Sequence, residues 1–133
     1  MEQYIGTKII QAEPQSRDGK EGYRVLYPDG YVSWSPKAAF EEAYRRTDGM
    51  SFGLAIEAAK KGKKIARAGW NGKNQHVELA SAISYTSPLG EVVNADHDAI
   101  GNQALAFVGT SGVQMGWLAS QADMLADDWM IVE

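Results

Sequence analysis

Residues 117–129 read WLASQADMLADDW, and this stretch predicts how the last two secondary-structure elements of the chain are arranged. Ser120 is a typical helix N-cap, which predicts a short helix directly after it. Trp129 opens the apolar run WMIV, which predicts a final strand. A second segment, AGWNGK, occupies residues 68–73. It contains the pair Gly69-Trp70, which matches the pair Gly116-Trp117 at the start of the first stretch. A short helix followed by a strand indicates a mixed α+β fold.

The sequence between and before these two segments supplies the other elements of the same domain. Ser51 predicts the N-cap of a helix, and Gly62 suits the left-handed position after its end. Ile65 is the inward residue of the strand that follows. Helices are expected over residues 52–61 and 121–125. Strands are expected over residues 63–68, 75–85, 105–108, 113–117 and 129–132. A tight turn is expected at residues 70–73, and a long loop with broken strands at residues 86–106. The order predicts an α+β fold, a small antiparallel sheet with short helices, in an oligomer.

The first 48 residues form a separate predicted unit of the type ββ(β)α. Alternating apolar residues indicate strands over residues 4–12, 23–27 and 31–34, joined by turns at Ser16–Gly22 and Pro28–Gly30. Ser35 followed by Pro36 is typical of a helix start, and this helix is expected to run to Arg46. Such a unit is small for independent stability, so it is expected to pack on residues 49–133 or on a second chain.

Composition and charge narrow the classes of function. The 133 residues include no cysteine and two histidines, which excludes disulfides, thiolate metal sites and cysteine nucleophiles. There is no apolar run long enough to span a membrane, and residues 1–10 do not resemble a signal peptide, so no membrane partner and a cytoplasmic location are expected. The net charge of −4 argues against nonspecific nucleic-acid binding. Six basic residues lie between positions 60 and 73, and after Lys73 the chain has eight acidic residues and no basic one.

The tryptophans and the local cations indicate a site for a flat polar ligand such as a nucleotide. Trp70 offers an aromatic face beside a predicted turn, and Trp117 fits a site or a core equally well. Trp129 precedes an apolar run and is expected in the core. Arg67 and Lys73 are the cations best placed for an anionic group, and the backbone of the Gly-Thr-Ser-Gly turn around Thr110 could also meet phosphate. The same residues could instead form only the core and caps of a small domain.

Catalytic and metal-binding patterns are weak. Asp123 and Asp127 lie on one helical face but lack the further ligands that a calcium or two-metal site needs. His76 could pair with Asp96 or Asp98, but neither a nucleophile elbow nor a P-loop accompanies it. We therefore expect a protein that is not an enzyme and carries no metal or cofactor.

The two tryptophan segments resemble a known family. MSFGLAIEAAKKGKKIARAGWNGK at residues 50–73, followed by GWLASQADMLADDWMIVE at residues 116–133, is similar to small phage proteins of the anti-Thoeris sponge family, second type. The leading unit resembles an N-terminal extension found on some phage members. The resemblance implies a homotetramer in the cytoplasm of the host bacterium, with ligand pockets between subunits, that binds glycocyclic ADP-ribose messengers of Thoeris immunity without cleaving them. It also implies that some members hold cyclic oligonucleotides at a separate site.

On this resemblance, the candidate residues receive hypothetical roles. Trp70 would stack on the adenine, Asn71 and Asp123 would bind ribose or base polar atoms, and Arg67, Lys73 or the N–H groups near Thr110 would meet the pyrophosphate. Trp117 and Ser120 complete the expected site. Two other functions stay open: an enzyme that degrades nucleotide signals, using Asp123, Asp127 and His76, and a structural phage module in which the tryptophans form only core and interface.

Overall fold

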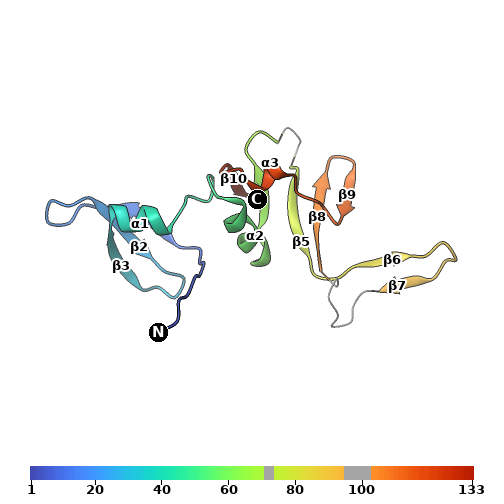
Figure 1. Cartoon of the computed structure of the whole chain (residues 1–133), viewed down its shortest axis with the longest axis horizontal. Helices are drawn as coiled ribbons and strands as arrows, with labels where there is room; N and C mark the ends of the chain where they lie inside the picture. The colour runs from blue at the N-terminus through green and yellow to red at the C-terminus, as the bar shows by residue number, and fades with distance from the viewer. Residues whose placement is uncertain (71–73, 95–102) are drawn as a thin grey trace. The chain divides into compact units, whose positions relative to one another are not determined.

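The computed structural model describes residues 1–70, 74–94 and 103–133, and the chain divides into two compact units, Met1–Arg46 and Thr47–Glu133. Figure 1 shows the elements of each unit along the chain. The predicted turn at residues 70–73 lies mostly outside the described residues, as do Asp96 and Asp98.

The first unit is a three-stranded antiparallel sheet with one short helix. Its strands β1 (Gln11–Pro14), β2 (Gly22–Leu26) and β3 (Val32–Pro36) pair in the order β1-β2-β3, and α1 (Lys37–Ala43) follows directly. Asp18 and Gly19 have φ angles of 52° and 77°, as the tight turn between Arg17 and Lys20 requires. Helix α1 covers one face of the sheet, where Phe40 stacks on Tyr23 with the ring centroids 4.1 Å apart. The two turns expected from the sequence are confirmed.

Two expectations for the first unit are wrong. The first strand begins at Gln11 and not at residue 4, because its partner β2 ends at Leu26 and offers no further residues for pairing. The helix begins at Lys37 and ends at Ala43, without a side-chain cap. Ser35 remains in β3, paired with Tyr23, and its hydroxyl donates to the carbonyl of Pro36 at 3.3 Å. The pairing with β2 therefore overrides the local Ser-Pro signal.

The second unit is built around a five-stranded antiparallel sheet of order β10-β4-β5-β8-β9. A separate two-stranded hairpin, β6-β7, connects β5 to β8 in the chain. The elements are α2 (Phe52–Lys60), β4 (Lys64–Arg67), β5 (His76–Ala80), β6 (Ser84–Thr86), β7 (Val92–Asn94), β8 (Ala104–Gly109), β9 (Gly112–Met115), α3 (Gln121–Met124) and β10 (Trp129–Val132). The fold class is confirmed as α+β with antiparallel sheets and short helices.

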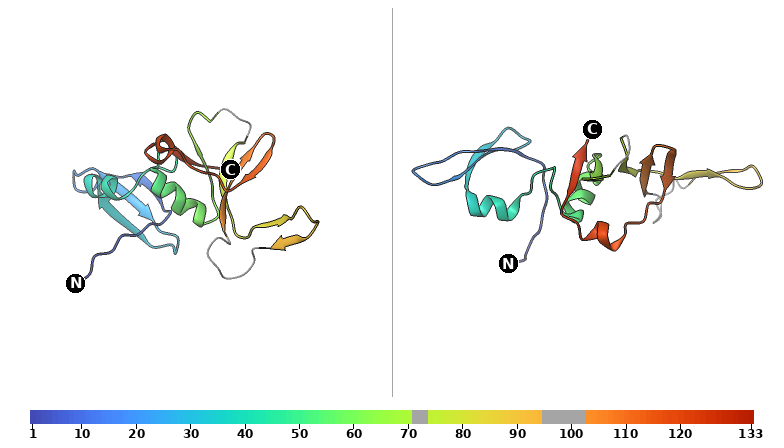
Figure 2. Two further views of the ribbon diagram at one scale, coloured as in Figure 1. Left: turned by 45° about the vertical axis from the view of Figure 1, so that its right-hand side comes forward. Right: turned by 90° about the horizontal axis from the view of Figure 1, so that it is seen from above.

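The core of the second unit lies between α2 and the strands β10, β4 and β5, on which the helix packs (Figure 2). Ala55 and Ala59 present small side chains that let the helix approach Ile65, Val77 and Trp129, and all five are fully buried. The predicted cap is also confirmed, since Ser51 accepts a hydrogen bond from the Leu54 N–H at 3.3 Å. Gly62 follows with a φ of 90°, and the inward position expected for Ile65 is confirmed.

The strand expected over residues 75–85 is broken in the structure. Strand β5 ends at Ala80, where its partner β8 begins with Ala104, and the chain then leaves the sheet to form the β6-β7 hairpin. The loop expected over residues 86–106 therefore includes strand β7 and the start of β8. None of the helices formed by the described residues is long and apolar enough to cross a membrane.

Candidate functional site

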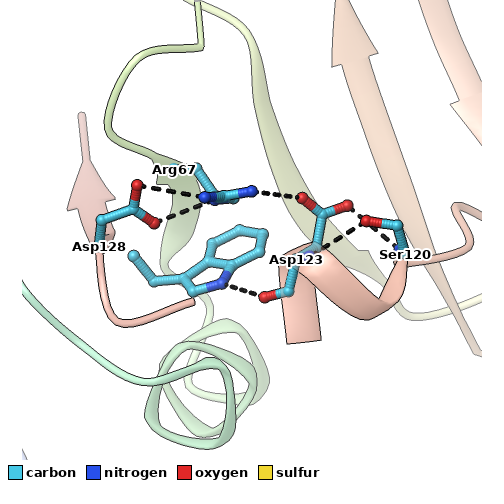
Figure 3. A network of polar contacts seen from close by, with 5 residues as sticks. Arg67, Ser120, Asp123 and Asp128 are labelled. Carbon is cyan, nitrogen blue, oxygen red and sulfur yellow. Dashed lines mark hydrogen bonds and ion pairs between the residues drawn. The ribbon is translucent and has the colours of Figure 1, made fainter. Parts of the chain in front are cut away.

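Arg67 joins the two tryptophan segments. It is the last residue of β4 and pairs with Trp129 of β10 in the sheet register. Its guanidinium donates from Nε to Asp128 Oδ1 at 3.0 Å and from Nη1 to Asp123 Oδ1 at 3.0 Å, and Figure 3 shows it between the two carboxylates. A third, longer bond runs from Nη2 to Asp128 Oδ2 at 3.4 Å. These contacts use three of the five guanidinium N–H groups and neutralise its charge locally.

Asp123 is held in place by contacts of both its side chain and its backbone. Its Oδ2 accepts from the Ser120 N–H at 3.2 Å, while the Ser120 hydroxyl accepts from the Asp123 N–H at 3.1 Å, which makes a capping box at the start of α3. Its carbonyl oxygen accepts from Trp129 Nε1 at 2.8 Å. The N-cap predicted at Ser120 is confirmed. The side chain of Asp123 is 18% exposed, so it is reachable from solvent only at its edge.

The electrostatics of this network favour the charged forms of Arg67 and Asp123. Burial raises the pKa of Asp123, but the hydrogen bonds from Arg67 and Ser120 outweigh it, and the pKa lies below its ordinary value of 3.8. The hydrogen bonds to Asp128 and then Asp123 raise the pKa of Arg67. Arg67 and Asp123 therefore face each other as a charged pair at neutral pH.

An aromatic cluster adjoins the polar network. Trp70, Trp117 and Trp129 lie with their ring centroids 5.4 to 6.1 Å apart, and each pair of rings is close to perpendicular. Trp129 is fully buried, so its expected core position is confirmed, whereas Trp70 and Trp117 are only partly buried. The ring of Phe107 in β8 packs against Trp70, with the two ring centroids 5.5 Å apart. The cluster thus has a buried centre and two indoles that reach solvent.

The glycine before each of these two indoles has a structural reason. Gly69 and Gly116 have φ angles of 84° and 80°, a conformation that other residues rarely adopt. After these glycines, the N–H of Trp70 donates to the carbonyl of Arg67 at 3.3 Å, and the N–H of Trp117 donates to that of Leu105 at 2.9 Å. Each Gly-Trp pair is therefore a reversal of the chain that directs an indole into the same cluster.

The structure brings five of the predicted site residues together: Arg67, Trp70, Trp117, Ser120 and Asp123. Asn71 and Lys73 lie outside the described residues. Thr110 is exposed in the turn between β8 and β9, at the edge of the sheet opposite β10.

Sequence reasoning did not assign Asp128 a partner. The charge distribution could have indicated this partner, because the C-terminal segment is rich in carboxylates and contains no basic residue of its own. Arg67 is one of the few cations in the chain with which these carboxylates could pair.

His76 does not form part of an acid–base pair with any described residue. It is buried, its Nδ1 lies 2.8 Å from the carbonyl oxygen of Asn74, and its Nε2 has no hydrogen-bond partner. Glu78 Oε2 lies 3.7 Å from that nitrogen, beyond hydrogen-bonding distance. Among residues 1–70, 74–94 and 103–133, no three histidine or carboxylate side chains gather as a metal site would require.

Fold and site together define a small antiparallel α+β domain that places two partly buried indoles beside an ion-paired polar network. A model of the Tad2-like family, described as the Thoeris anti-defense 2-like domain, matches residues 50–132, and the chain belongs to this family. The protein "Thoeris anti-defense 2" of Bacillus phage SP01 is 40% identical over 88 residues, which cover 62% of this chain and 94% of that relative. The family membership expected from the sequence is confirmed, and it supports an anti-Thoeris function.

Proposed function

We propose that the chain binds a glycocyclic ADP-ribose messenger of Thoeris immunity and holds it intact in the host cytoplasm, so that the immune effector is not activated. The observation that carries the proposal is the pair of partly buried indoles, Trp70 and Trp117, next to the Asp123 network in a domain of this family. Indoles stack on flat bases, and carboxylates accept hydrogen bonds from ribose hydroxyls. Holding a messenger requires affinity and no catalytic group.

We propose the following roles for individual residues. Trp70 stacks on the adenine, with Trp117 as the second wall. Arg67 already donates to Asp123 and Asp128, so we assign it first to positioning these carboxylates. The pyrophosphate is then met by Lys73, by the two remaining N–H groups of Arg67, or by the backbone near Thr110 of a neighbouring subunit. Asn71 and Ser120 add polar contacts to the ribose or base.

We further propose that the protein acts as a homotetramer with pockets between subunits. Strand β9 lies at an edge of the five-stranded sheet, and its residues are exposed on both faces. At this edge Val113 of β9 and Leu118, which follows β9 closely in the chain, are 62% and 89% exposed. A second copy at this edge would cover them. Light scattering coupled to gel filtration should give four times the chain mass, and a monomer at micromolar concentration would overturn this arrangement.

Recovery of bound messenger tests the main proposal. The protein is mixed with glycocyclic ADP-ribose, freed of unbound ligand, heat-denatured, and the released material is analysed by mass spectrometry. We expect intact messenger in stoichiometric amount. A converted product would instead indicate an enzyme that degrades the signal. The absence of retained ligand would contradict both functions and favour a structural phage module.

Substitution of Trp70 tests the placement of the site. Loss of base stacking costs about 1–3 kcal/mol, so Trp70→Ala should weaken messenger binding by roughly fivefold to 150-fold. Trp70→Phe keeps an aromatic face and the packing on Phe107, and should lose less. Tyr4→Ala is the matched control, because Tyr4 is 92% exposed and lies outside the matched family region. Unchanged binding in a folded Trp70→Ala variant would contradict the placement but not the function.

A further inference from the structure

The first unit has a cavity that the family domain does not include. Val25 is buried on the face that α1 covers, and because side chains alternate along a strand, Arg24 lies on the opposite face. A cavity of about 360 Å³ lies there. The residues that line it include Gln15, Arg17, Arg24, Tyr31 and Trp34.

Trp34 is held rigidly in this cavity. Its Nε1 donates to the carbonyl of Gln15 at 2.7 Å, which ties it to the end of β1. The indole also lies so close to Gly22 of β2 that a Cβ at this position would approach the ring to 2.4 Å. Glycine is therefore required at residue 22 for the ring to lie there. The guanidinium of Arg17 rests over the same ring, 5.5 Å from its centroid.

The cavity contains two guanidinium groups that are available to an anion. Arg17 forms no ion pair with a carboxylate among the described residues, and the Trp34 ring holds its planar group in place. Arg24 is the cross-strand partner of Trp34 and of Glu13, and its Nη1 lies 3.8 Å from Glu13 Oε1. Both of these side chains are well exposed, so this pair is weak and an incoming anion can compete with it.

The geometry points to a nucleoside phosphate as the ligand of this cavity. Guanidinium groups bind phosphate through paired N–H donors, which accounts for Arg17 and Arg24. The ring of Tyr31, at the rim and 64% exposed, offers a face on which a base can stack. The volume lies at the small end of the range for ligand pockets and fits a mononucleotide better than a polymer. We propose that the first unit binds a free mononucleotide at this position, independently of the messenger site.

Titration of the full chain with ADP tests this site. We expect saturable one-to-one binding by calorimetry, together with a shift of the Trp34 indole N–H resonance, assigned from a Trp34→Phe variant. Adenosine and inorganic phosphate should each bind at least tenfold more weakly than ADP, since each lacks one half of the contacts. ADP binding should persist in Trp70→Ala, which separates this site from the messenger site.

Charge variants decide whether the two arginines hold the phosphate. Arg24→Ala and Arg17→Ala should each weaken ADP binding about tenfold or more. Glu13→Gln should strengthen it several-fold, because it removes the competing carboxylate. Lys37→Ala is the matched control, since Lys37 begins α1, outside the cavity, and pairs with Glu21.

Three results would overturn the proposal. The first is the absence of saturable ADP binding up to millimolar concentration. The second is unchanged affinity in Arg24→Ala, or in Arg24→Gln should the alanine variant fail to fold. The third is a single-stranded hexanucleotide that binds more than tenfold tighter than ADP, which would indicate a nucleic-acid surface instead.

Discussion

Asp123 is the residue on which the second unit's polar network converges. Its side chain accepts from Arg67 and from the Ser120 N–H, and its backbone oxygen accepts from the buried Trp129. One residue thus links strand β4, helix α3 and the aromatic core. A ligand that contacts Asp123 would meet a carboxylate already oriented by its neighbours, which lowers the ordering cost of binding.

The lowered pKa of Asp123 predicts a specific acid sensitivity. A carboxylate with a lower pKa in the folded than in the unfolded state contributes stability above its unfolded pKa, and this contribution is lost as the pH falls through the folded pKa. With an ordinary value of 3.8, the wild type should exceed Asp123→Asn in unfolding free energy at pH 7. The difference should shrink steadily below about pH 4. Urea unfolding at several pH values measures it.

A neighbouring aspartate provides the control for this prediction. Asp127 is exposed, and no hydrogen bond or ion pair from its side chain is seen in the described part of the chain. Asp127→Asn should therefore leave both the stability and its pH dependence nearly unchanged. A gap between wild type and Asp123→Asn that stays constant from pH 7 to pH 3 would contradict the assignment.

The sequence pointed to Arg67 and to the two Gly-Trp pairs, but not to the residues that each of them contacts. Arg67 stood out as a cation ahead of an acidic segment, but its pairing with Asp123 and Asp128 depends on β4 and β10 being neighbours. That pairing joins residues about sixty positions apart, which no local pattern specifies. The Gly-Trp pairs were likewise visible as motifs, while the shared cluster of their indoles is a property of the fold.

At the scale of elements, the helix caps show where the local sequence determines the secondary structure and where tertiary pairing determines it. Ser51 and Ser120 cap α2 and α3 as their local sequence predicts, because no strand competes for these residues. Ser35 carries the same type of signal, yet pairing with Tyr23 keeps it in β3. The break between β5 and β6 follows the same logic, since the length of β8 ends the pairing. Local chemistry thus predicts an element unless a strand partner claims its residues.

Alanine substitutions at these serines test that distinction. Ser51→Ala and Ser120→Ala should each lower the unfolding free energy by about 1 kcal/mol, because each leaves a helix N–H without its side-chain acceptor. Ser35→Ala should change it by less than half as much, since the Ser35 hydroxyl caps no helix. Thermal unfolding followed by circular dichroism gives the comparison. An equal loss in all three variants would mean that Ser35 caps α1 in solution.

At the scale of the whole molecule, the two units differ in charge. Residues 1–46 contain seven basic and seven acidic residues, whereas residues 47–133 contain six basic and ten acidic ones. The entire net charge of −4 therefore belongs to the second unit, which is also the unit proposed to hold a pyrophosphate. Binding an anion there requires local cations or backbone N–H groups, and it should weaken less with salt than binding to an extended basic surface.

The family relationship is carried by the second unit. The relative from Bacillus phage SP01 has 94% of its length within an 88-residue alignment, so it has no room for a further unit of the size of residues 1–46. The family match begins at residue 50. The contacts of the second unit begin earlier, because the carbonyl of Thr47 accepts from the Ile131 N–H at 2.8 Å.

The position of a truncation should therefore decide whether the second unit folds. Met50 is 4% exposed, its N–H donates to the carbonyl of Trp129 at 2.7 Å, and its own carbonyl accepts from the Trp129 N–H at 3.0 Å. A fragment of residues 47–133 keeps these contacts and should match the full chain in messenger affinity within about twofold. A fragment of residues 51–133 loses them, and burial of a methionine together with the backbone bonds contributes about 3 kcal/mol or more.

Unfolding of the two fragments in urea measures this difference directly. Met50→Ala within the longer fragment separates the two contributions, because it removes the side chain and keeps the backbone bonds to Trp129. Its stability should lie between those of the two fragments. Equal stability of both fragments would show that residues 47–50 are dispensable. A longer fragment that fails to fold would show that the second unit depends on residues 1–46, and the relative without such a unit would then need another source of stability.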